Sequence, residues 1–500
     1  MDTINHLLLG LQVCIEPANL FLAFLGCLIG TLVGVLPGLG PAATISLLLP
    51  ASFHISPVGA LILLAGIYYG TQYGGSTTSI LLNIPGEASS VVTCLEGYEM
   101  AKKGQAGPAL GIAAFGSFVA GTAATVGLML LAPPLAQMAL KFGPPEYSTL
   151  VILGLTVLTF LVKGSMSKAL AMAAFGLFLS TIGLDAVSGV ARFSFGKVEL
   201  MDGIGLVPVV MGLFGIAEVL LNLEKTMRRE ILEGRIETYL PTREDWRRSG
   251  FPIFRGSVIG FFLGIIPGGG SVLASFVSYA IEKKVSRHPE NFGKGMIEGV
   301  AGPESANNSA SIGAFIPLLT LGIPSNVVVA ILLGAMMIHG LQPGPNLIQD
   351  HPHVFWGVIT SMYIGNVMLL LLNLPLIGLW VQVLRVPYGL LFPLILLFCL
   401  IGAYSLNFAT FDILIMIVFG VIGYLMKKTD YEAAPLILAM VLGGIFENAL
   451  RQSLILSDGS PLIFFTRPIA AAFLWTAIAL IILPVIPWSR RKRQSIAIEG

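Results

Sequence analysis

Long apolar stretches recur along the whole of this 500-residue chain, and they constrain its fold more than any other feature. A transmembrane α-helix needs about 20 mostly apolar residues, whereas the strands of a membrane β-barrel are alternating segments of about ten. Because these stretches are long and continuous, and because only 11% of the residues are charged, we predict an all-α polytopic membrane protein. The predicted spans lie near residues 20–36, 58–82, 109–131, 147–162, 169–184, 204–222, 256–281, 305–340, 354–380, 388–403, 412–426, 433–450 and 468–487.

Charge and short motifs exclude several classes of function. A net charge of +1 argues against nucleic acid as a partner, because proteins that bind it usually carry a clustered basic excess. The sequence contains no GxxxxGK[ST] nucleotide loop, which disfavours a primary pump, and no HExxH zinc motif. We therefore predict a protein that is not an enzyme and that holds no metal or cofactor. An intramembrane enzyme and a channel remain the alternatives to a secondary transporter.

Lysine and arginine are distributed unevenly between the loops, and this distribution predicts the orientation of the chain. The interval 224–255 holds eight of them, whereas residues 1–19 hold none. With the N-terminus outside, 23 of the 28 basic residues lie inside, provided that 20–50 and 256–281 each return to the side from which they entered. Both stretches are interrupted by Pro-Gly, so we predict that they are broken or re-entrant.

The two interrupted stretches are copies of one another. Three spaced glycines and a Pro-Gly-x-Gly turn recur at a constant offset of 230, pairing Gly26, Gly30, Gly34, Pro37, Gly38 and Gly40 with Gly256, Gly260, Gly264, Pro267, Gly268 and Gly270. LLNIPGE at 81–87 also matches TLGIPSN at 320–326, and Glu218 matches Glu447. We therefore divide the chain into a repeat at 1–222, a basic linker at 223–251, a second repeat at 252–452, and an extra helix with a basic tail at 453–500.

Each repeat holds an odd number of predicted crossings, so the two are expected to have inverted topology. Inverted repeats with helices broken by Gly and Pro at equivalent positions are typical of secondary transporters. Backbone groups freed at such a break must be buried in protein or line a wet cavity. The N–H groups at the start of a half-helix suit a carboxylate ligand.

Uncharged polar residues accumulate at membrane depth in both repeats, at 70–87 (GTQYGGSTTSILLNIPGE) and 302–313 (GPESANNSASIG). A single hydroxyl there can bond to its own helix, and a GxxxG pair can serve only close helix packing. Six of the polar residues in the first stretch together favour a solvated ligand path: Gln72, Ser76, Thr77, Thr78, Ser79 and Asn83. Glu304 has a second interpretation as a helix cap, and Glu218 and Glu447 are either functional carboxylates or side chains that reach the membrane surface.

The motifs PGLGP, GTQYGGSTTSILLNIPGE, PESANNSA and LGIPS resemble those of the large membrane subunit of the tripartite tricarboxylate transporters, the TctA family. The resemblance covers residues 1 to about 487. It implies a multi-pass importer of a citrate-like di- or tricarboxylate in the bacterial inner membrane, driven by a sodium or proton gradient. It also implies two partners, a small membrane subunit and a periplasmic solute-binding protein. The N-terminus would then be periplasmic and the C-terminus cytoplasmic.

The candidate binding residues are neutral, because the polar stretches contain no lysine or arginine. Neutral donors bind an anion weakly, which suits a site that must also release it, and a nearby cation would offset the remaining charge. The candidate substrate-binding residues are Gly38, Gly40, Ser76, Thr77, Asn83, Gly86, Gly268, Gly270, Asn307, Ser325 and Asn326, and the candidate cation ligands are Asn308 and Ser309. We expect the two Pro-Gly turns to be equivalent and to face each other near the membrane midplane.

Overall fold

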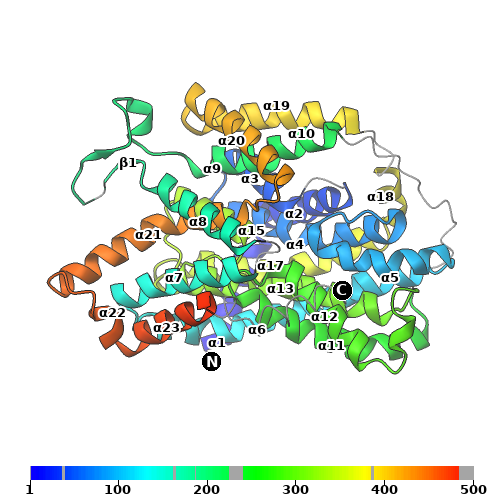
Figure 1. Ribbon diagram of the computed structural model, residues 1–500. Helices are drawn as coiled ribbons and strands as arrows, with labels where there is room; N and C mark the ends of the chain where they lie inside the picture. Colours follow the sequence, from blue (N-terminus) through cyan, green and yellow to red (C-terminus); the bar gives the residue numbers. More distant parts are fainter. Residues whose placement is uncertain are drawn as a thin grey trace. The chain divides into compact units, whose positions relative to one another are not determined.

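Helices make up nearly all of the structure, a computed structural model that describes residues 2–36, 40–161, 165–185, 187–224, 240–383 and 388–482 (Figure 1). Within these ranges the strands are a two-residue antiparallel pair, β1 (Gly183–Leu184) with β2 (Ala191–Arg192). Six helices among the described residues are long and apolar enough to cross a membrane. The prediction of an all-α polytopic membrane protein is therefore confirmed, and the inverted topology of the repeats stays a prediction.

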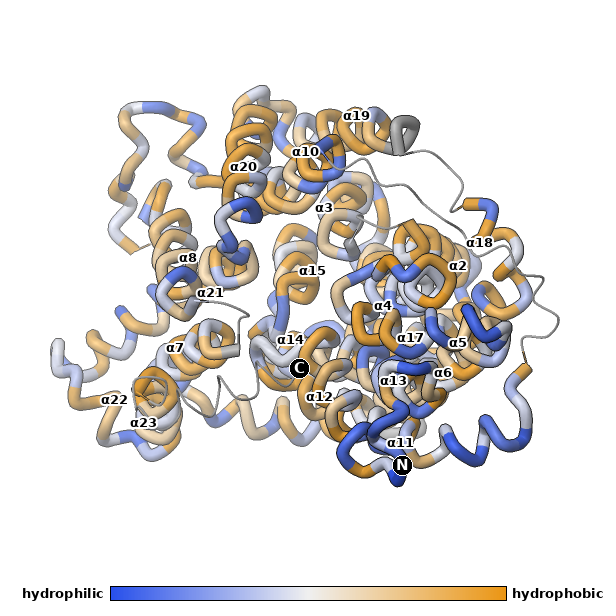
Figure 2. The backbone as a smooth tube through the Cα atoms, turned by 45° about the vertical axis from the view of Figure 1, so that its right-hand side comes forward, coloured by the Kyte–Doolittle hydropathy of each residue, from blue (hydrophilic) through white to orange (hydrophobic). Residues whose placement is uncertain are grey.

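The chain divides into two compact units, Met1–Gln137 with Gly205–Leu425 and Met138–Ile204 with Met426–Gly500. Hydrophobic residues dominate the helices of each (Figure 2). The helices assigned mainly to the first unit are α1 (Asp2–Ile15), α2 (Pro17–Val35), α3 (Pro41–Ser52), α4 (Pro57–Leu82), α5 (Val91–Lys102), α6 (Ala106–Ala139), α9 (Leu206–Val210), the π-helix η3 (Met211–Ile216), α10 (Ala217–Glu224), α11 (Arg243–Ile265), α12 (Gly270–Val285), α13 (Glu298–Gly313), α14 (Phe315–Leu321), α15 (Val327–Ile338), α16 (Leu347–Asp350), α17 (Pro352–Asn373), α18 (Ile377–Val383), α19 (Tyr388–Asn407) and α20 (Thr410–Lys428). Short 3-10 turns η1 (Ala88–Ser90) and η4 (Pro289–Asn291) lie between them.

The second unit contains α7 (Pro144–Leu161), α8 (Met166–Ser180), α21 (Ala434–Leu456), α22 (Ile463–Thr466) and α23 (Pro468–Ile482), with a 3-10 turn η2 (Val198–Leu200). Helices α7 and α8 come from the first predicted repeat, whereas α21 belongs to the second, and all three pack together. Gly176 on α8 lies against the backbone of Leu436 on α21. The two compact units therefore do not coincide with the two predicted repeats, and the repeat boundaries remain a prediction.

The helix breaks lie where Gly and Pro predict them. Helix α2 ends at Val35 and α3 begins at Pro41, while α11 ends at Ile265 and α12 begins at Gly270. The predicted span 305–340 is wrong as a single helix, because the chain forms α13, α14 and α15 there. Gly322 ends α14 with a left-handed φ of 69°, and Pro324 follows, so the helix cannot continue.

Helices α1, α3, α5, α16 and α22 lie outside every predicted span, and α1 and α5 show the reason. Helix α1 is short, but Gly10 on it lies directly against the backbone of Trp356 on α17. Helix α5 is only 12 residues long and carries charged side chains, so its apolar content is too low for a span signal. Both helices are held by packing against longer helices, a feature that hydropathy alone does not detect.

The spaced glycines pack helix against helix in the same way in both halves. On α2, Gly30 lies so close to α4 that a Cβ there would be 2.6 Å from the carbonyl oxygen of Ile67 and 2.9 Å from the Cα of Gly70. On α11, a Cβ at Gly260 would lie 2.8 Å from the Cα of Ala306 on α13. The packing interpretation of GxxxG is confirmed.

The contacts also repeat with a fixed register. The three α2 glycines face the carbonyl groups of Leu63, Ile67 and Thr71, and the three α11 glycines face those of Gly302, Ala306 and Ala310. Each carbonyl residue on α4 and its counterpart on α13 are separated by 239 residues, the same offset that relates LLNIPGE to TLGIPSN. The helix pairs α2–α4 and α11–α13 are therefore local structural equivalents.

Candidate functional site

Helix α4 is buried over most of its length, and its polar residues are buried with it. Every residue from Gly59 to Leu82 is inaccessible to solvent, so the run GTQYGGSTTS faces protein on all sides. Glycines allow this because α2 approaches α4 at backbone distance along one face. The polar groups of α4 must therefore find partners in the neighbouring helices, since buried polar groups without partners are costly.

The partner on α13 is Glu304, which lies within the helix rather than at its start. The helix begins at Glu298, and the interpretation of Glu304 as a cap is therefore wrong: Pro303 lies inside α13 instead of at its first turn. The Glu304 carboxylate is fully buried and accepts hydrogen bonds from Ser76 Oγ at 2.6 Å, Asn307 Nδ2 at 3.2 Å and Thr93 Oγ1. Helices α4, α5 and α13 thus converge on one carboxylate.

Asn308 extends this network toward α6. Its Nδ2 donates to Ser117 Oγ at 2.7 Å, to Asn307 Oδ1 at 2.7 Å and to the Glu304 carbonyl oxygen at 3.1 Å. Ser117 in turn donates to the same carbonyl oxygen at 3.3 Å. Ser309, by contrast, faces α11 and donates to the Ser257 carbonyl oxygen at 2.6 Å. The two candidate cation ligands therefore face different helices.

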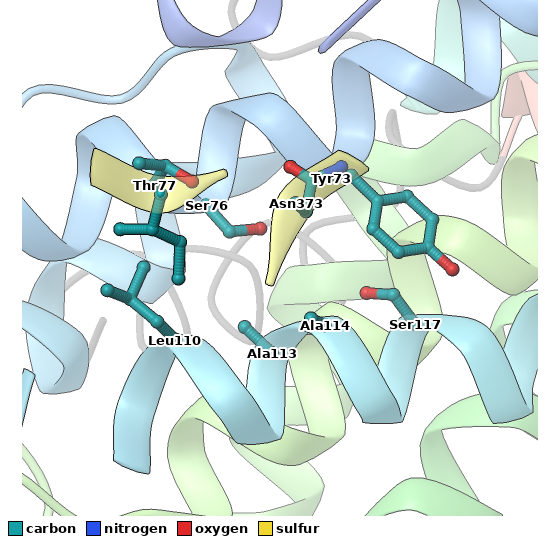
Figure 3. A pocket seen from close by; sticks show the side chains of 9 residues that line it. Tyr73, Ser76, Thr77, Leu110, Ala113, Ala114, Ser117 and Asn373 are labelled. Carbon is teal, nitrogen blue, oxygen red and sulfur yellow. The ribbon is translucent and has the colours of Figure 1, made fainter. Parts of the chain in front are cut away.

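A small pocket adjoins the network. Figure 3 shows Ser76, Thr77 and Tyr73 of α4 opposite Ser117 and three apolar residues of α6, with Asn373 of α17 beside them. The enclosed space has room for about one water molecule. Ser76 and Ser117 belong to both the pocket wall and the Glu304 network, so a ligand in the pocket would contact that network through two hydroxyls.

A second cluster forms at the breaks of the C-terminal half. The Gly268 N–H donates to the Ser325 carbonyl oxygen at 2.7 Å, so the turn after α11 meets the turn before α15. Gly268 has a φ of 78°, a left-handed conformation that other residues adopt only with strain. The buried Ser325 hydroxyl has no hydrogen-bond partner among the described residues. The cluster thus presents a donor without an internal acceptor.

Asn326 connects this second cluster to α4. Its Oδ1 caps α15 by accepting from the Val329 N–H at 3.0 Å, and its Nδ2 donates to the Tyr68 hydroxyl at 3.1 Å. Gly270 starts α12 nearby, where a Cβ would lie 3.8 Å from the Asn326 Cβ. The predicted residues Gly268, Gly270, Ser325 and Asn326 are therefore brought together by the fold.

The remaining candidates of the N-terminal half are more scattered. Gly40 starts α3 in open space, and Asn83 is exposed at the end of α4 with a left-handed φ of 56°. Gly86 is buried, and a Cβ there would lie 2.6 Å from the Gly75 Cα. Gly38 lies outside the described residues, so the predicted meeting of the two Pro-Gly turns stays a prediction.

Glu447 of the second unit belongs to an ion-pair cluster. It pairs with Arg192 at 2.6 Å and with Arg451 at 2.6 Å, and Arg451 also holds Asp185 by hydrogen bonds of 3.0 and 2.8 Å. The Arg451 guanidinium and two backbone N–H groups keep the pKa of the Asp185 carboxyl well below its usual range. Glu218, which matches Glu447 in the first predicted repeat, accepts hydrogen bonds from Asn222 Nδ2. The two glutamates thus differ in environment.

Sequence reasoning missed Thr93, Ser117 and Tyr68, and its interpretation of Glu304 as a helix cap was wrong. No local signal marks the first two, because a lone Thr or Ser on a helix usually bonds to its own backbone. Glu304 could have been found as the acidic residue within the polar run 302–313. Among the described residues, no group of three or more His, Cys, Asp or Glu could hold a metal ion.

Apolar helices, interrupted beside buried and uncharged polar groups, define a membrane transport protein. More specifically, the chain belongs to the tripartite tricarboxylate transporter TctA family, whose profile matches residues 20–438. The resemblance predicted from the motifs is confirmed.

Two relatives from Agrobacterium vitis are similar to this chain. An uncharacterized 52.8 kDa protein in the TAR-I ttuC' 3' region is 52% identical over 499 residues, covering 100% of this chain and 99% of the relative. An uncharacterized protein in the TAR-II ttuC' 3' region is 51% identical over 240 residues, which is 48% of this chain and 99% of that protein. No solved structure matches the chain.

Proposed function

We propose that the protein is the large membrane subunit of a secondary transporter that imports a di- or tricarboxylate across the bacterial inner membrane. In this proposal a periplasmic solute-binding protein delivers the substrate, a small membrane subunit completes the transporter, and a sodium or proton gradient drives uptake. Family membership supports the class of substrate and the tripartite assembly. The observation that carries the mechanism is the junction of two helix breaks, where Gly268 bonds to Ser325 beside the capped start of α15.

Such a junction suits an anion that must be bound and released. The N-termini of α12 and α15 present backbone N–H groups, and the unpartnered Ser325 hydroxyl adds a neutral donor. Neutral donors avoid the strong ion pair that a lysine or arginine would form, so release stays fast. Thr77 and Asn307 would contribute further donors from the α4–α13 side, while the Ser76 hydroxyl holds Glu304 beside them.

The pocket between α4 and α6 is too small for a carboxylate of citrate size, since it has room for about one water molecule. Substrate entry in this proposal therefore requires the pocket walls to separate. On the α6 wall Ala113 and Ala114 make apolar contacts, and separating this wall breaks the hydrogen bonds that Ser117 forms with α13. A transporter that alternates between closed and open forms needs such a contact.

Uptake by proteoliposomes containing all three components tests the function. A panel of one tricarboxylate (citrate), two dicarboxylates (succinate and malate) and one monocarboxylate (acetate) is offered while sodium and proton gradients are imposed separately. We expect accumulation of at least one di- or tricarboxylate with one gradient, and exchange of labelled for unlabelled substrate without any gradient. Uptake that follows the substrate's own gradient and shows no counterflow would indicate a channel instead.

Both candidate cation ligands form hydrogen bonds within the protein. Asn308 already gives its amide hydrogens to Ser117, Asn307 and Glu304, while Ser309 is bonded to α11. If sodium drives uptake and these residues bind it, Asn308→Ala should raise the sodium concentration needed for half-maximal uptake. Ser309→Ala provides the comparison on the opposite face of α13.

A further inference from the structure

Glu304 is a buried carboxylate whose charge is not balanced by a neighbouring base. Its side chain is fully buried, and it takes part in none of the ion pairs formed by the residues that the structure describes. Ionised acids inside proteins are costly unless a cation or several donors compensate the charge, and the cost disappears when the acid takes up a proton. The three donors around Glu304 are neutral.

The surroundings of Glu304 supply no other compensating charge. Helices α4, α6 and α14 carry no charged side chain, and the titratable groups of α4 are the phenols of Tyr68, Tyr69 and Tyr73. The titratable and charged groups that face α13 from the other elements include Glu87 before η1, Cys94 and Glu96 on α5, Arg248 and Arg255 on α11, and Tyr279 and Glu282 on α12. Arg248 is paired with Glu298 at the start of α13.

Most of these groups are already engaged. Arg255 forms a two-point pair with Glu282 at 2.8 and 2.5 Å. Glu96 accepts from the Tyr279 hydroxyl at 2.9 Å and from the Gly295 and Met296 N–H groups at 2.7 and 2.8 Å. Glu87 is a second acid near Glu304, and its negative charge adds to the cost of ionising both.

Glu304 can take up a proton, and the hydrogen bonds around it can rearrange, without movement of any heavy atom. Ser76 Oγ lies 2.6 Å from Glu304 Oε2 and 3.2 Å from the Gln72 carbonyl oxygen, so its single hydrogen has two acceptors within reach. Beside an ionised Glu304 the Ser76 hydroxyl donates to the carboxylate. When Glu304 is protonated, its O–H donates to Ser76 Oγ, and the serine hydrogen turns to the Gln72 carbonyl oxygen.

This hydroxyl connects the acid to the pocket. Ser76 lines the pocket wall, so a ligand carboxylate placed there would lie one side chain away from Glu304. A negative charge on Glu304 repels such an anion, and a neutral Glu304 does not. Thermodynamic linkage then requires that the proton and the anion strengthen each other's binding by the same factor.

We propose that Glu304 binds the coupling proton of carboxylate import, with Ser76 as the positioning residue that links the proton to the substrate pocket. The proton comes from the periplasmic solution, forms the O–H bond of the Glu304 carboxyl, and leaves to the cytoplasm after the anion has gone. No other bond changes. This assignment rests on the proposed import function, and it names protons as the driving ion.

Transport assays on the complete three-component transporter in proteoliposomes provide the first test, with the panel acid that the wild type moves as the probe. Wild type, Glu304→Gln, Glu304→Asp and a surface control, Glu290→Gln, are compared with an acidic outside. We expect Glu304→Gln to reduce gradient-driven uptake about tenfold or more while counterflow exchange stays within about twofold, because glutamine resembles the protonated acid. Glu304→Asp should keep pH-driven uptake, and Glu290→Gln should match wild type. Undiminished pH-driven uptake by Glu304→Gln would overturn the proposal.

Infrared difference spectroscopy of the purified full-length chain with its small membrane subunit provides a second test that needs no transport. Raising the pH should remove a carboxylic C=O stretching band in wild type and in Glu290→Gln, and this band should be missing from Glu304→Gln. If Glu304→Gln also loses counterflow, the infrared band distinguishes the two explanations. A titrating band that is present in wild type and missing from Glu304→Gln supports the proton site. Identical bands in wild type and Glu304→Gln refute the proton site.

The two tests separate this proposal from the function on which it rests. Wild-type proteoliposomes that move no acid of the panel, together with a titrating band that Glu304→Gln removes, would refute carboxylate import and leave Glu304 as a proton-binding residue. Uptake driven by sodium alone, with sodium dependence lost in Glu304→Gln, would support import and refute the assignment of the proton.

Discussion

Asn326 Nδ2 donates a hydrogen bond to the Tyr68 hydroxyl at 3.1 Å, across 258 residues of sequence. The same asparagine caps α15 through its Oδ1. One side chain therefore fixes a helix start in the C-terminal half and ties it to the buried α4 of the N-terminal half. The bond places the breaks of one half against the polar helix of the other, as a site shared by two repeats requires.

Replacing Asn326 with alanine should remove both hydrogen bonds that its side chain forms. Asn326→Ala loses the helix cap, worth about 1 kcal/mol, and a buried hydrogen bond of about 1 kcal/mol. Tyr68→Phe loses only the second. Thermal unfolding in detergent should rank the stabilities as wild type, Tyr68→Phe and then Asn326→Ala. Tyr363→Phe is the control, because within the described part of the chain the Tyr363 hydroxyl forms one weak hydrogen bond, to a methionine sulfur at 4.0 Å. Equal unfolding of Asn326→Ala and wild type would contradict the capping role.

Ser76 and Ser79 offer a matched pair on α4. Both are buried, and each hydroxyl bonds to the carbonyl four residues earlier, but Ser76 also contacts Glu304 and lines the pocket. Ser76→Ala should raise the apparent substrate constant about tenfold, because it removes the hydrogen bond that holds Glu304 beside the pocket, and a hydrogen bond to a charged group is worth about 1.5 kcal/mol or more. Ser79→Ala should leave the constant unchanged. Uptake rates over a range of substrate concentrations measure both, and equal effects of the two changes would remove Ser76 from the site.

Gly260 and Gly250 on α11 test the helix packing. A methyl group at Gly260 would lie 2.8 Å from the Ala306 Cα, whereas one at Gly250 meets nothing within 4 Å. Gly260→Ala should therefore destabilise the protein by about 1–3 kcal/mol through overpacking. Gly250→Ala should stabilise it by about 0.5–1 kcal/mol, because alanine favours helices. Opposite shifts of the unfolding temperature are expected, and a stabilised Gly260→Ala would show that α11 and α13 are not in contact.

The Asp185–Arg451 pair predicts a specific pH dependence of stability. Because Arg451 lowers the pKa of Asp185 in the folded state, the pair stabilises the protein above the ordinary carboxyl pKa and loses this effect as the pH falls through the lowered one. Asp185→Asn should lower the unfolding temperature at neutral pH and at about pH 5 alike, and the difference from wild type should shrink in stronger acid. Asp202→Asn, at an exposed site in the same loop, is the control. A difference that grows on acidification would contradict the pairing.

Membrane orientation is tested by labelling single cysteines from one side. The distribution of basic residues predicts that cysteines at Asn5 and Ser457 react from the periplasm, and that cysteines at Glu237 and Ser495 react from the cytoplasm. The native cysteines, Cys14, Cys27, Cys94 and Cys399, are all buried, so background labelling should be small. Periplasmic labelling of Glu237 would overturn the orientation and the inverted topology together.

The sequence by itself determined the helical membrane class, the helix breaks after α2 and α11, and the glycines that pack these helices against α4 and α13. These follow from local causes: apolar stretches longer than a soluble protein tolerates, Pro and Gly that cannot continue a helix, and glycines whose spacing of four residues puts them on one face. Gly268, Gly270, Ser325 and Asn326 were predicted as one site for the same reason, because both turns are marked in the local sequence.

Only the tertiary structure decided which polar side chains meet. Ser76 and Glu304 are separated by 228 residues, and Thr93 and Glu304 by 211, so no periodicity in the sequence relates them. Glu304 shares a helix with Asn308 and Ser309, yet Asn308 turns to α6 and Ser309 to α11. Because each helix presents different faces to different neighbours, the partners of a buried polar residue depend on how the helices pack around it.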